Sequence, residues 1–438
     1  DVNDPNFTEK IASAYIRLGV GRIPSSSVEE AKSDIDKLCK DVLTPDYGPW
    51  RNNAMFAAET GDADMHIKQA DEIANLFETK YNTDFEINKV YIDMYPRAVN
   101  EPQVKESDRS SVEARRSFID LLKRGQYFAT YVGHAGYKSF THSKLWSSSD
   151  ALGINFEHLP IFTTACCDVA RYDSDKRGIA EHMFHNPNGG AIALLTSTRE
   201  VYANSNHTLN QAFVKNFFDW KTNGIPTLGN VVMKAKQAFG TVSNPNKLKY
   251  ALLGDPAMQL AYPLPLFTIT QINGEYVNDD TQVNVQPMQG VTVTAQVLTK
   301  GGNLNTDFNG DATLTIYDRV KPITLPEDKS TVVNFPRDIL VQVQGRVVDG
   351  IFTGTAVMPR NCRAINETGV IRIYAHKDNS SDMVNGQFNN LVIKEYTQAG
   401  ALEDNAAPVI TSMYLNEETS FVDGAVVPAN STLYLHVN

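Results

Sequence analysis

Two apolar segments of this chain each end on a side chain that can take part in covalent catalysis. Residues 131–136 read Tyr-Val-Gly-His-Ala-Gly and contain His134, and residues 161–168 read Ile-Phe-Thr-Thr-Ala-Cys-Cys-Asp and contain Cys167. An imidazole can take the proton of a thiol and so produce the thiolate nucleophile. Ligands of open α/β sheets bind beyond the carboxyl ends of the strands, so two adjacent strands ending in His and Cys would present both groups to one crevice. The pattern predicts a cysteine peptidase.

The other parts of such a site also have candidates. The backbone N–H groups of Cys167 and Ala135 are the expected donors to an oxyanion. A carboxylate usually orients the imidazole. Another strand ends near residue 58, and we expect Glu59, which follows it, to fill that role, with Asp62 or Asp64 as alternatives.

The cysteines leave alternatives open. The chain has four of them, Cys39, Cys166, Cys167 and Cys362, without a C-x-x-C repeat, so neither a disulfide framework nor a zinc ribbon fits. A free cysteine after a buried strand is often only a small apolar residue. The adjacent pair could also form a strained vicinal disulfide. Because side chains alternate along an extended chain, we expect one cysteine of the pair to face the core and the other the crevice.

No cofactor is expected. His182 and His185 share a helical face, but the sequence around them is not H-E-x-x-H and offers no third ligand, so a solvated helix end is favoured over zinc. Calcium is an alternative at the turns 278–280 and 309–311, which are rich in Asn and Asp, although such residues are common in ordinary turns.

Composition excludes some classes of function. The formal net charge is −11 with a pI near 5.4, and no Lys/Arg-rich run occurs, so nucleic acid is not an expected partner. No apolar run has the roughly 18 residues of a membrane span. The chain opens without a methionine and stops within what reads as a strand, so we expect a piece of a longer protein.

The chain divides by pattern into three parts. Residues 1–262 alternate strand-like and amphipathic segments, which predicts an α/β domain with a mostly parallel sheet. Residues 263–403 show period-two strands between turns, which predicts a β-sandwich of immunoglobulin type, and residues 404–438 begin a further β segment. The expected strands are 54–58, 90–94, 127–133, 161–165, 191–196, 290–297, 312–317, 338–343, 370–375 and 408–415, and the expected helices are 27–38, 67–81, 112–124, 179–185, 209–220 and 228–239.

The segments around His134 and Cys167 resemble the gingipain-like cysteine peptidases, and among them the sortase-like peptidases of the type IX secretion system. The resemblance covers about residues 15–262. It also rests on the following shorter pieces: Gly21-Arg-Ile-Pro24, Gly48-Pro-Trp-Arg51, His66 with Gln69-Ala-Asp71, Asn188-Gly-Gly-Ala-Ile-Ala193, Thr198-Arg199 and Leu253-Gly-Asp-Pro-Ala257.

The resemblance implies a caspase-like α/β catalytic domain followed by immunoglobulin-like β-domains. It implies that His134 is the base and Cys167, not Cys166, the nucleophile, while Glu59 matches the acidic residue only by its position at a strand end. The implied location is the bacterial cell surface, peripheral to the outer membrane. The implied partners are C-terminal sorting domains of secreted proteins, anionic lipopolysaccharide, and the outer-membrane barrel and other surface components of the secretion system.

One residue departs from the family pattern, and two other functions stay open. Ala135 stands where the family has glycine, and it keeps the N–H donor if its φ angle is negative. A plain secreted endopeptidase of the same fold is one alternative. A catalytically inactive or latent scaffold in a surface secretion complex is the other, because fold alone does not determine function.

Overall fold

The structure is a computed structural model of the 438-residue chain. The residues it describes are 16–43, 45–59, 61–79, 85–99, 101, 103, 110–141, 144–219, 224–239, 244, 246–326, 328–335, 338–362, 366–398, 410–415 and 433–437. None of the described helices combines the length and the apolar character that a membrane span requires.

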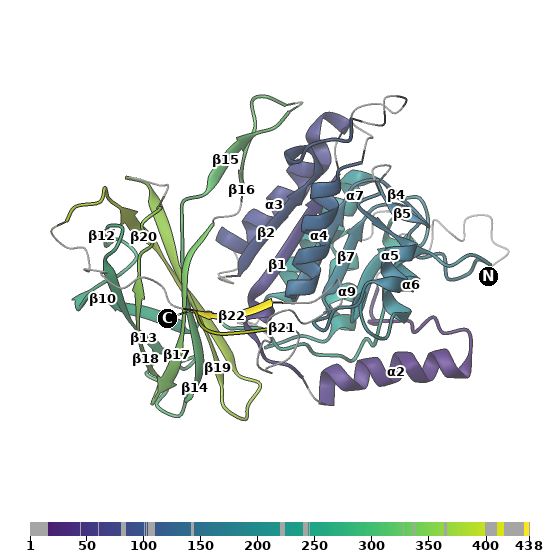
Figure 1. The fold of residues 1–438 in the computed structure, drawn as a ribbon. Coiled ribbons are helices and arrows are strands. Elements are labelled where there is room, and N and C mark those ends of the chain that lie inside the picture. Colours follow the sequence, from purple (N-terminus) through teal and green to yellow (C-terminus); the bar gives the residue numbers. More distant parts are fainter. Residues whose placement is uncertain are drawn as a thin grey trace.

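The first domain is built on a six-stranded sheet whose strand order is β2-β1-β3-β7-β8-β9 (Figure 1). Five neighbouring strands run parallel, and the edge strand β9 is antiparallel to β8. Nearly every residue of the central strands is buried, as expected for a parallel sheet covered on both faces. The strands are β1 (Asn53–Ala58), β2 (Glu86–Tyr91), β3 (Phe128–Val132), β7 (Ile161–Ala165), β8 (Ala193–Ser197) and β9 (Tyr250–Leu253).

Helices cover both faces of this sheet. Helices α3 (Met65–Thr79), α7 (Ala203–Phe217) and α9 (Leu228–Gln237) pack together on one face. The other helices among the described residues of the domain are α2 (Val28–Leu43), α4 (Val112–Arg124), α5 (Ser148–Gly153), α6 (Ile179–His185) and α10 (Asn246–Lys249). The structure therefore confirms the mixed α/β fold with a mostly parallel sheet.

Most expected elements of this domain are found, and three of them, β7, α4 and α6, have the expected bounds. Helix α4 is well marked because Ser111 accepts the N–H of Ala114 as its N-cap and Gly125 follows its last residue. The bounds of the other elements differ from the expected ones, and two of these differences have a clear cause. Strand β2 ends at Tyr91, before the expected end at residue 94, because Ile92–Met94 form a 3-10 turn. Helix α7 starts at Ala203, earlier than the expected residue 209. The early start was missed because buried asparagines on the inner face of the helix interrupt its apolar period.

The second domain is a mixed sheet of nine strands in the order β11-β10-β13-β18-β17-β14-β19-β20-β12. The sheet curls so that Leu264, just before β10, forms a bridge with Val384 of β20. Its apolar side chains form a core of their own. The strands are β10 (Phe267–Ile272), β11 (Glu275–Tyr276), β12 (Val283–Val285), β13 (Gly290–Val297), β14 (Gly310–Tyr317), β17 (Ile339–Val348), β18 (Ile351–Val357), β19 (Thr368–Lys377) and β20 (Met383–Ile393).

The expected strands of residues 290–375 are therefore present, whereas the immunoglobulin type and the domain boundaries stay predictions. Strands β21 (Ile410–Leu415) and β22 (Leu433–Val437) form a separate two-stranded sheet. The first of them corresponds to the strand expected at 408–415, whose first two residues lie outside the described part of the chain.

A hairpin of the second domain packs against the first domain. It consists of β15 (Lys321–Thr324) and β16 (Val332–Phe335), which leave the nine-stranded sheet and lie beside α3 (Figure 1). Leu325 and Val333 of this hairpin are buried in the core of the first domain. Neither this hairpin nor its packing was predicted from the sequence.

Candidate active site

Three neighbouring strands bring the predicted catalytic residues to one edge of the first sheet. In the sheet register, Ala58 of β1 lies opposite Val132 of β3, which in turn lies opposite Ala165 of β7. Glu59 directly follows the first strand, and His134 and Cys167 each lie two residues beyond the paired ends of the other two. Adjacent strands are about 4.8 Å apart, so the backbones of the base and the nucleophile lie in neighbouring loops.

The two adjacent cysteines have different environments. Cys166 is buried in the apolar core at 1% exposure, and burial raises the pKa of its thiol well above the usual range. Cys167 is only partly buried, and its Sγ lies 3.4 Å from the backbone nitrogen of Val201. All four cysteines are free thiols. The geometry therefore favours Cys167 as the accessible thiol and Cys166 as a core residue.

A carboxylate contacts the imidazole of the predicted base. Nε2 of His134 lies 3.1 Å from Oδ2 of Asp62, and both side chains are about half exposed. If Nε2 donates to this carboxylate, Nδ1 is the nitrogen that can take the proton of the thiol. The structure thus favours Asp62, one of the two alternatives, as the residue that orients the ring.

Glu59, the first choice from sequence, lies beneath the base. Its carboxylate accepts the backbone N–H of His134, and the hydroxyl of Tyr131 lies 3.5 Å from the same oxygen. Tyr131 also donates to the carbonyl of His134 at 2.7 Å. A Cβ at Gly133 would lie 2.5 Å from the Tyr131 hydroxyl and 2.6 Å from Cβ of Glu59, so only glycine fits there. These contacts fix the backbone that carries the base.

His66 is a second imidazole in the site. It is buried at 2% exposure, its Nε2 lies 3.1 Å from the Asp62 oxygen that also contacts His134, and the two rings pack edge to face. Burial lowers the pKa of His66, and the neighbouring His134 lowers it further. From the sequence, His66 was expected only as part of the family resemblance. Its spacing four residues after Asp62, on the first turn of α3, was the available signal.

The loop that carries Asp62 has an unusual backbone. Asp62, Ala63 and Asp64 have φ angles of 51°, 55° and 59°, a left-handed conformation that disfavours residues with a Cβ. Such a conformation persists only where surrounding contacts hold it. Here the backbone N–H of Asp328, in the hairpin of the second domain, donates to Oδ2 of Asp64 at 2.6 Å. Lys68 pairs with the Asp328 carboxylate at 2.5 Å.

Ala135 fits its position without strain. It begins the short strand β4 (Ala135–Gly136), which pairs with β5 (Ser139–Phe140), and its φ angle is not positive. The substitution of the family glycine by alanine therefore leaves the N–H in place. The roles of the Ala135 and Cys167 N–H groups as oxyanion donors stay predictions.

Charged side chains surround the loop after the nucleophile. Asp168 has a φ of 58° and pairs with Arg171 at 2.6 Å. Arg199 pairs with Asp173 in an exposed contact. These charged residues belong to the segment that follows Cys167 and to the loop after β8.

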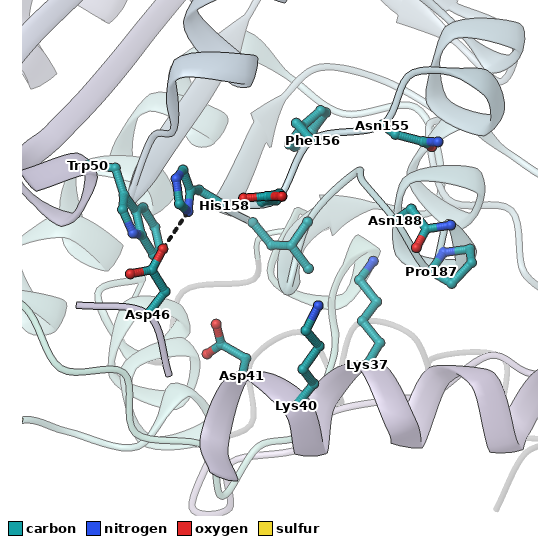
Figure 2. A pocket seen from close by; sticks show the side chains of 12 residues that line it. Lys37, Lys40, Asp41, Asp46, Trp50, Asn155, Phe156, His158, Pro187 and Asn188 are labelled. Carbon is teal, nitrogen blue, oxygen red and sulfur yellow. Dashed lines mark ion pairs between the residues drawn. The ribbon is translucent and has the colours of Figure 1, made fainter. Parts of the chain in front are cut away.

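A pocket of the first domain lies at the opposite edge of the sheet from the predicted catalytic residues. It has a volume of about 660 Å³, and Lys40, Asp46, Trp50 and His158 are among the residues that line it (Figure 2). Trp50 and His158 precede β1 and β7, so this pocket lies at the amino ends of strands whose carboxyl ends carry the predicted catalytic groups. It is therefore separate from the candidate active site.

The other predicted binding residues have protein partners. Nδ1 of His185 lies 3.0 Å from Oδ2 of Asp34. In the two turns considered for calcium, Asn278 accepts the N–H of Asp280, and Asp311 pairs with Arg346. The expectation of no cofactor, with calcium as an alternative, stays a prediction.

Comparisons with known proteins relate the first domain to one family. Residues 2–261, more than half of the chain, match the model of peptidase family C25. No curated protein matches the sequence.

Several solved structures are similar. The Arg-specific cysteine proteinase gingipain R has 16% identity and a TM-score of 0.45, with 85% of this chain and 74% of that chain covered. A complex of the pro- and mature domains of RgpB from Porphyromonas gingivalis has 16% identity and a TM-score of 0.44, with 87% and 78% covered. Dimeric latent PorU from the same organism has 14% identity and a TM-score of 0.34, with 86% and 46% covered.

Proposed function

Since the chain belongs to peptidase family C25, the gingipain-like cysteine peptidases, we propose that it is a sortase-like transpeptidase of the bacterial cell surface. In this proposal Cys167 is the nucleophile, His134 the base and Asp62 the residue that orients the base. The single observation that carries the catalytic assignment is the contact of Asp62 with His134, in the loop next to the one that holds Cys167.

The reaction follows from these groups. Nδ1 of His134 takes the thiol proton, and the Cys167 thiolate attacks the carbonyl carbon of the scissile peptide bond. The tetrahedral oxyanion is stabilised by the N–H groups of Cys167 and Ala135. When the C–N bond breaks, the leaving amine receives the proton from His134, and a thioester remains on Cys167.

The acceptor decides between two outcomes of the same intermediate. Water would release the acid and make the protein an endopeptidase. An amine would form a new amide bond and make it a transpeptidase. We propose that the substrates are C-terminal sorting domains of proteins secreted by the type IX system and that the acceptor is an amine of anionic lipopolysaccharide. This finer proposal rests on the sequence resemblance to PorU-like sortases.

The remaining parts of the proposal concern location and partners. The protein would act peripherally at the outer membrane, beside the outer-membrane barrel and other surface components of the secretion system. The second domain, an immunoglobulin-like module in this proposal, would contribute surface for such partners. Nucleic acid plays no part.

Incubation with a peptide that spans the junction of a cargo protein and its sorting domain tests the proposal. Mass spectrometry would follow the thioester and the products, with and without a small amine. The proposal predicts an adduct at Cys167 and an amide product that increases with amine concentration, both absent in Cys167→Ala. Hydrolysis that the amine does not affect would indicate that the protein is a plain endopeptidase. No adduct and no cleavage would support the inactive or latent scaffold.

A further inference from the structure

We infer that the candidate active site contains an inhibitory site for a divalent transition metal such as Zn²⁺, formed by His66, His134 and Glu59 with Asp62 as a fourth ligand. One ligand atom from each of the first three residues lies within 4.8 Å of the other two. Two imidazoles and a carboxylate form a ligand set that zinc uses in proteins. The metal binding does not depend on the proposed function, whereas the inhibition does.

The position of Asp62 supports the inference. Its Oδ2 atom lies 3.1 Å from Nε2 of His66 and 3.1 Å from Nε2 of His134. In a tetrahedral site with bonds of 2.0–2.1 Å, two ligand atoms are about 3.3 Å apart. The distances from the Asp62 oxygen to the two nitrogens are therefore close to those that the metal needs.

The remaining adjustment falls on a side chain that can move. His134 is 57% exposed, so its ring can rotate toward the metal. His66 is held in the core, and its Nδ1 is buried without a hydrogen-bond partner among the described residues. One ligand is thus fixed and the other adjustable. Solvent reaches the site through the exposed faces of His134 and Asp62.

Metal binding would prevent His134 from acting as a base, because it fixes which ring nitrogen carries the proton. A metal on Nε2 of His134 leaves the ring proton on Nδ1, and a nitrogen that carries a proton cannot accept one from a thiol. The Cys167 thiol then stays protonated. The thiol is not needed as a ligand, which distinguishes this site from chelation of a metal between a catalytic cysteine and histidine.

Calorimetric titration with Zn²⁺ tests the binding without activity. We expect Cys167→Ala to bind one Zn²⁺ with a dissociation constant of about 1 μM or below. Adding His66→Gln or His134→Gln to that variant should weaken binding about 10-fold or more, because each removes a ligand. Adding His376→Gln, in β19 of the second domain, should leave binding unchanged. The exposed position of His134 makes its variant informative even if the buried His66→Gln fails to fold.

Inhibition of the chain with its cysteine intact provides the second readout. We expect Zn²⁺ to slow alkylation of Cys167 and a chelator to restore the rate. The Zn²⁺ concentration that halves the uninhibited rate of each protein should be about 10-fold higher for His66→Gln than for the original chain. The inference is overturned if Cys167→Ala does not bind Zn²⁺, or if both histidine variants bind it as tightly as their parent. An active peptidase without this binding would contradict the inference alone.

Discussion

The two halves of the candidate active site are held by different parts of the molecule. The nucleophile loop is tied to its own sheet, since Ser197 of β8 donates to the carbonyl of Cys166 at 2.5 Å and Ala170 donates back to Ser197 at 3.0 Å. The acid loop of Asp62 is held from outside, through the contact of Asp64 with the hairpin of the second domain. The position of the nucleophile thus follows from the first domain alone, whereas that of the acid depends on both domains.

The largest effect should separate the two cysteines. Cys167→Ala should lower peptide cleavage by about 10³-fold or more, because no other group can form the thioester. Cys166→Ala should keep activity within a few-fold of the original, since this thiol is buried in the core. Steady-state kinetics would measure both. A reversal of the two results would show that Cys166, not Cys167, is the nucleophile.

The next effect separates the two carboxylates on the acid side. Asp62→Asn should lower kcat by about 10²-fold, because the amide cannot stabilise a positively charged His134 ring. Glu59→Gln should lower it by only about 10-fold, since the amide oxygen still accepts the backbone N–H of His134. Both rates should be compared with unfolding temperatures. A larger loss in Glu59→Gln would make Glu59 the acid.

A third prediction tests the role of the hairpin directly. Asp64→Ala removes the acceptor for the Asp328 N–H, so the strained loop should lose its outer contact and kcat should fall about 10-fold, with little change in KM. Asp64→Asn keeps an acceptor oxygen and should restore most of the rate. Lys68→Met removes only a partly exposed ion pair and should change it less than about 3-fold. Equal losses in all three variants would indicate general destabilisation.

A buried lysine of the first domain makes a prediction about pH and stability. Lys37 of α2 donates from its buried ammonium to backbone carbonyls at the end of α6, among them Phe184 at 2.9 Å and Asn186 at 2.8 Å. Burial lowers the pKa of Lys37 to about 7. Between about pH 7 and 10 the unfolded chain therefore binds more protons than the folded one, so this group makes stability rise with pH. Below pH 7 its contribution is constant.

Denaturant unfolding at pH 7 and pH 9 would measure that contribution. The stability of Lys37→Met should rise less between the two values than that of the original chain, since methionine fills the space without titrating. Identical changes in both proteins would contradict the assignment.

The smallest effect is expected at Ala135. Because this residue already has an unstrained φ angle, Ala135→Gly should leave kcat within about 2-fold and lower the free energy of unfolding by about 0.5–1 kcal/mol. Activity assays and thermal unfolding would measure these changes. A large gain in kcat would show that the alanine methyl group disturbs the oxyanion position.

The sequence predicted the parts of this molecule that depend on local pattern. The apolar runs before His134 and Cys167 have the length and burial of parallel strands, and their ends therefore meet at one edge of the sheet. The alternation of Cys166 and Cys167 predicted one buried and one accessible thiol, as the structure has them.

The features that the sequence missed depend on contacts between distant residues. Asp62, rather than Glu59, contacts the imidazole because residues 62–64 form a left-handed turn. The sequence Asp62-Ala63-Asp64 does not predict such a turn, because it contains no glycine. The hairpin that holds this turn lies more than 250 residues away in the chain, and the contact of Asp328 with Asp64 joins the two domains. No local pattern encodes such a contact.

The most direct test of the central claim is the rate at which a small alkylating reagent labels Cys167 at mildly acidic pH. A thiolate paired with His134 should react near pH 5.5, where an ordinary thiol with a pKa of about 8.5 is almost fully protonated. We expect peptide mapping to find the label at Cys167, no labelling in Cys167→Ala, and labelling slowed about 10-fold or more in His134→Ala. Label at Cys166, or labelling of Cys167 that appears only at alkaline pH and is unchanged in His134→Ala, would contradict the account.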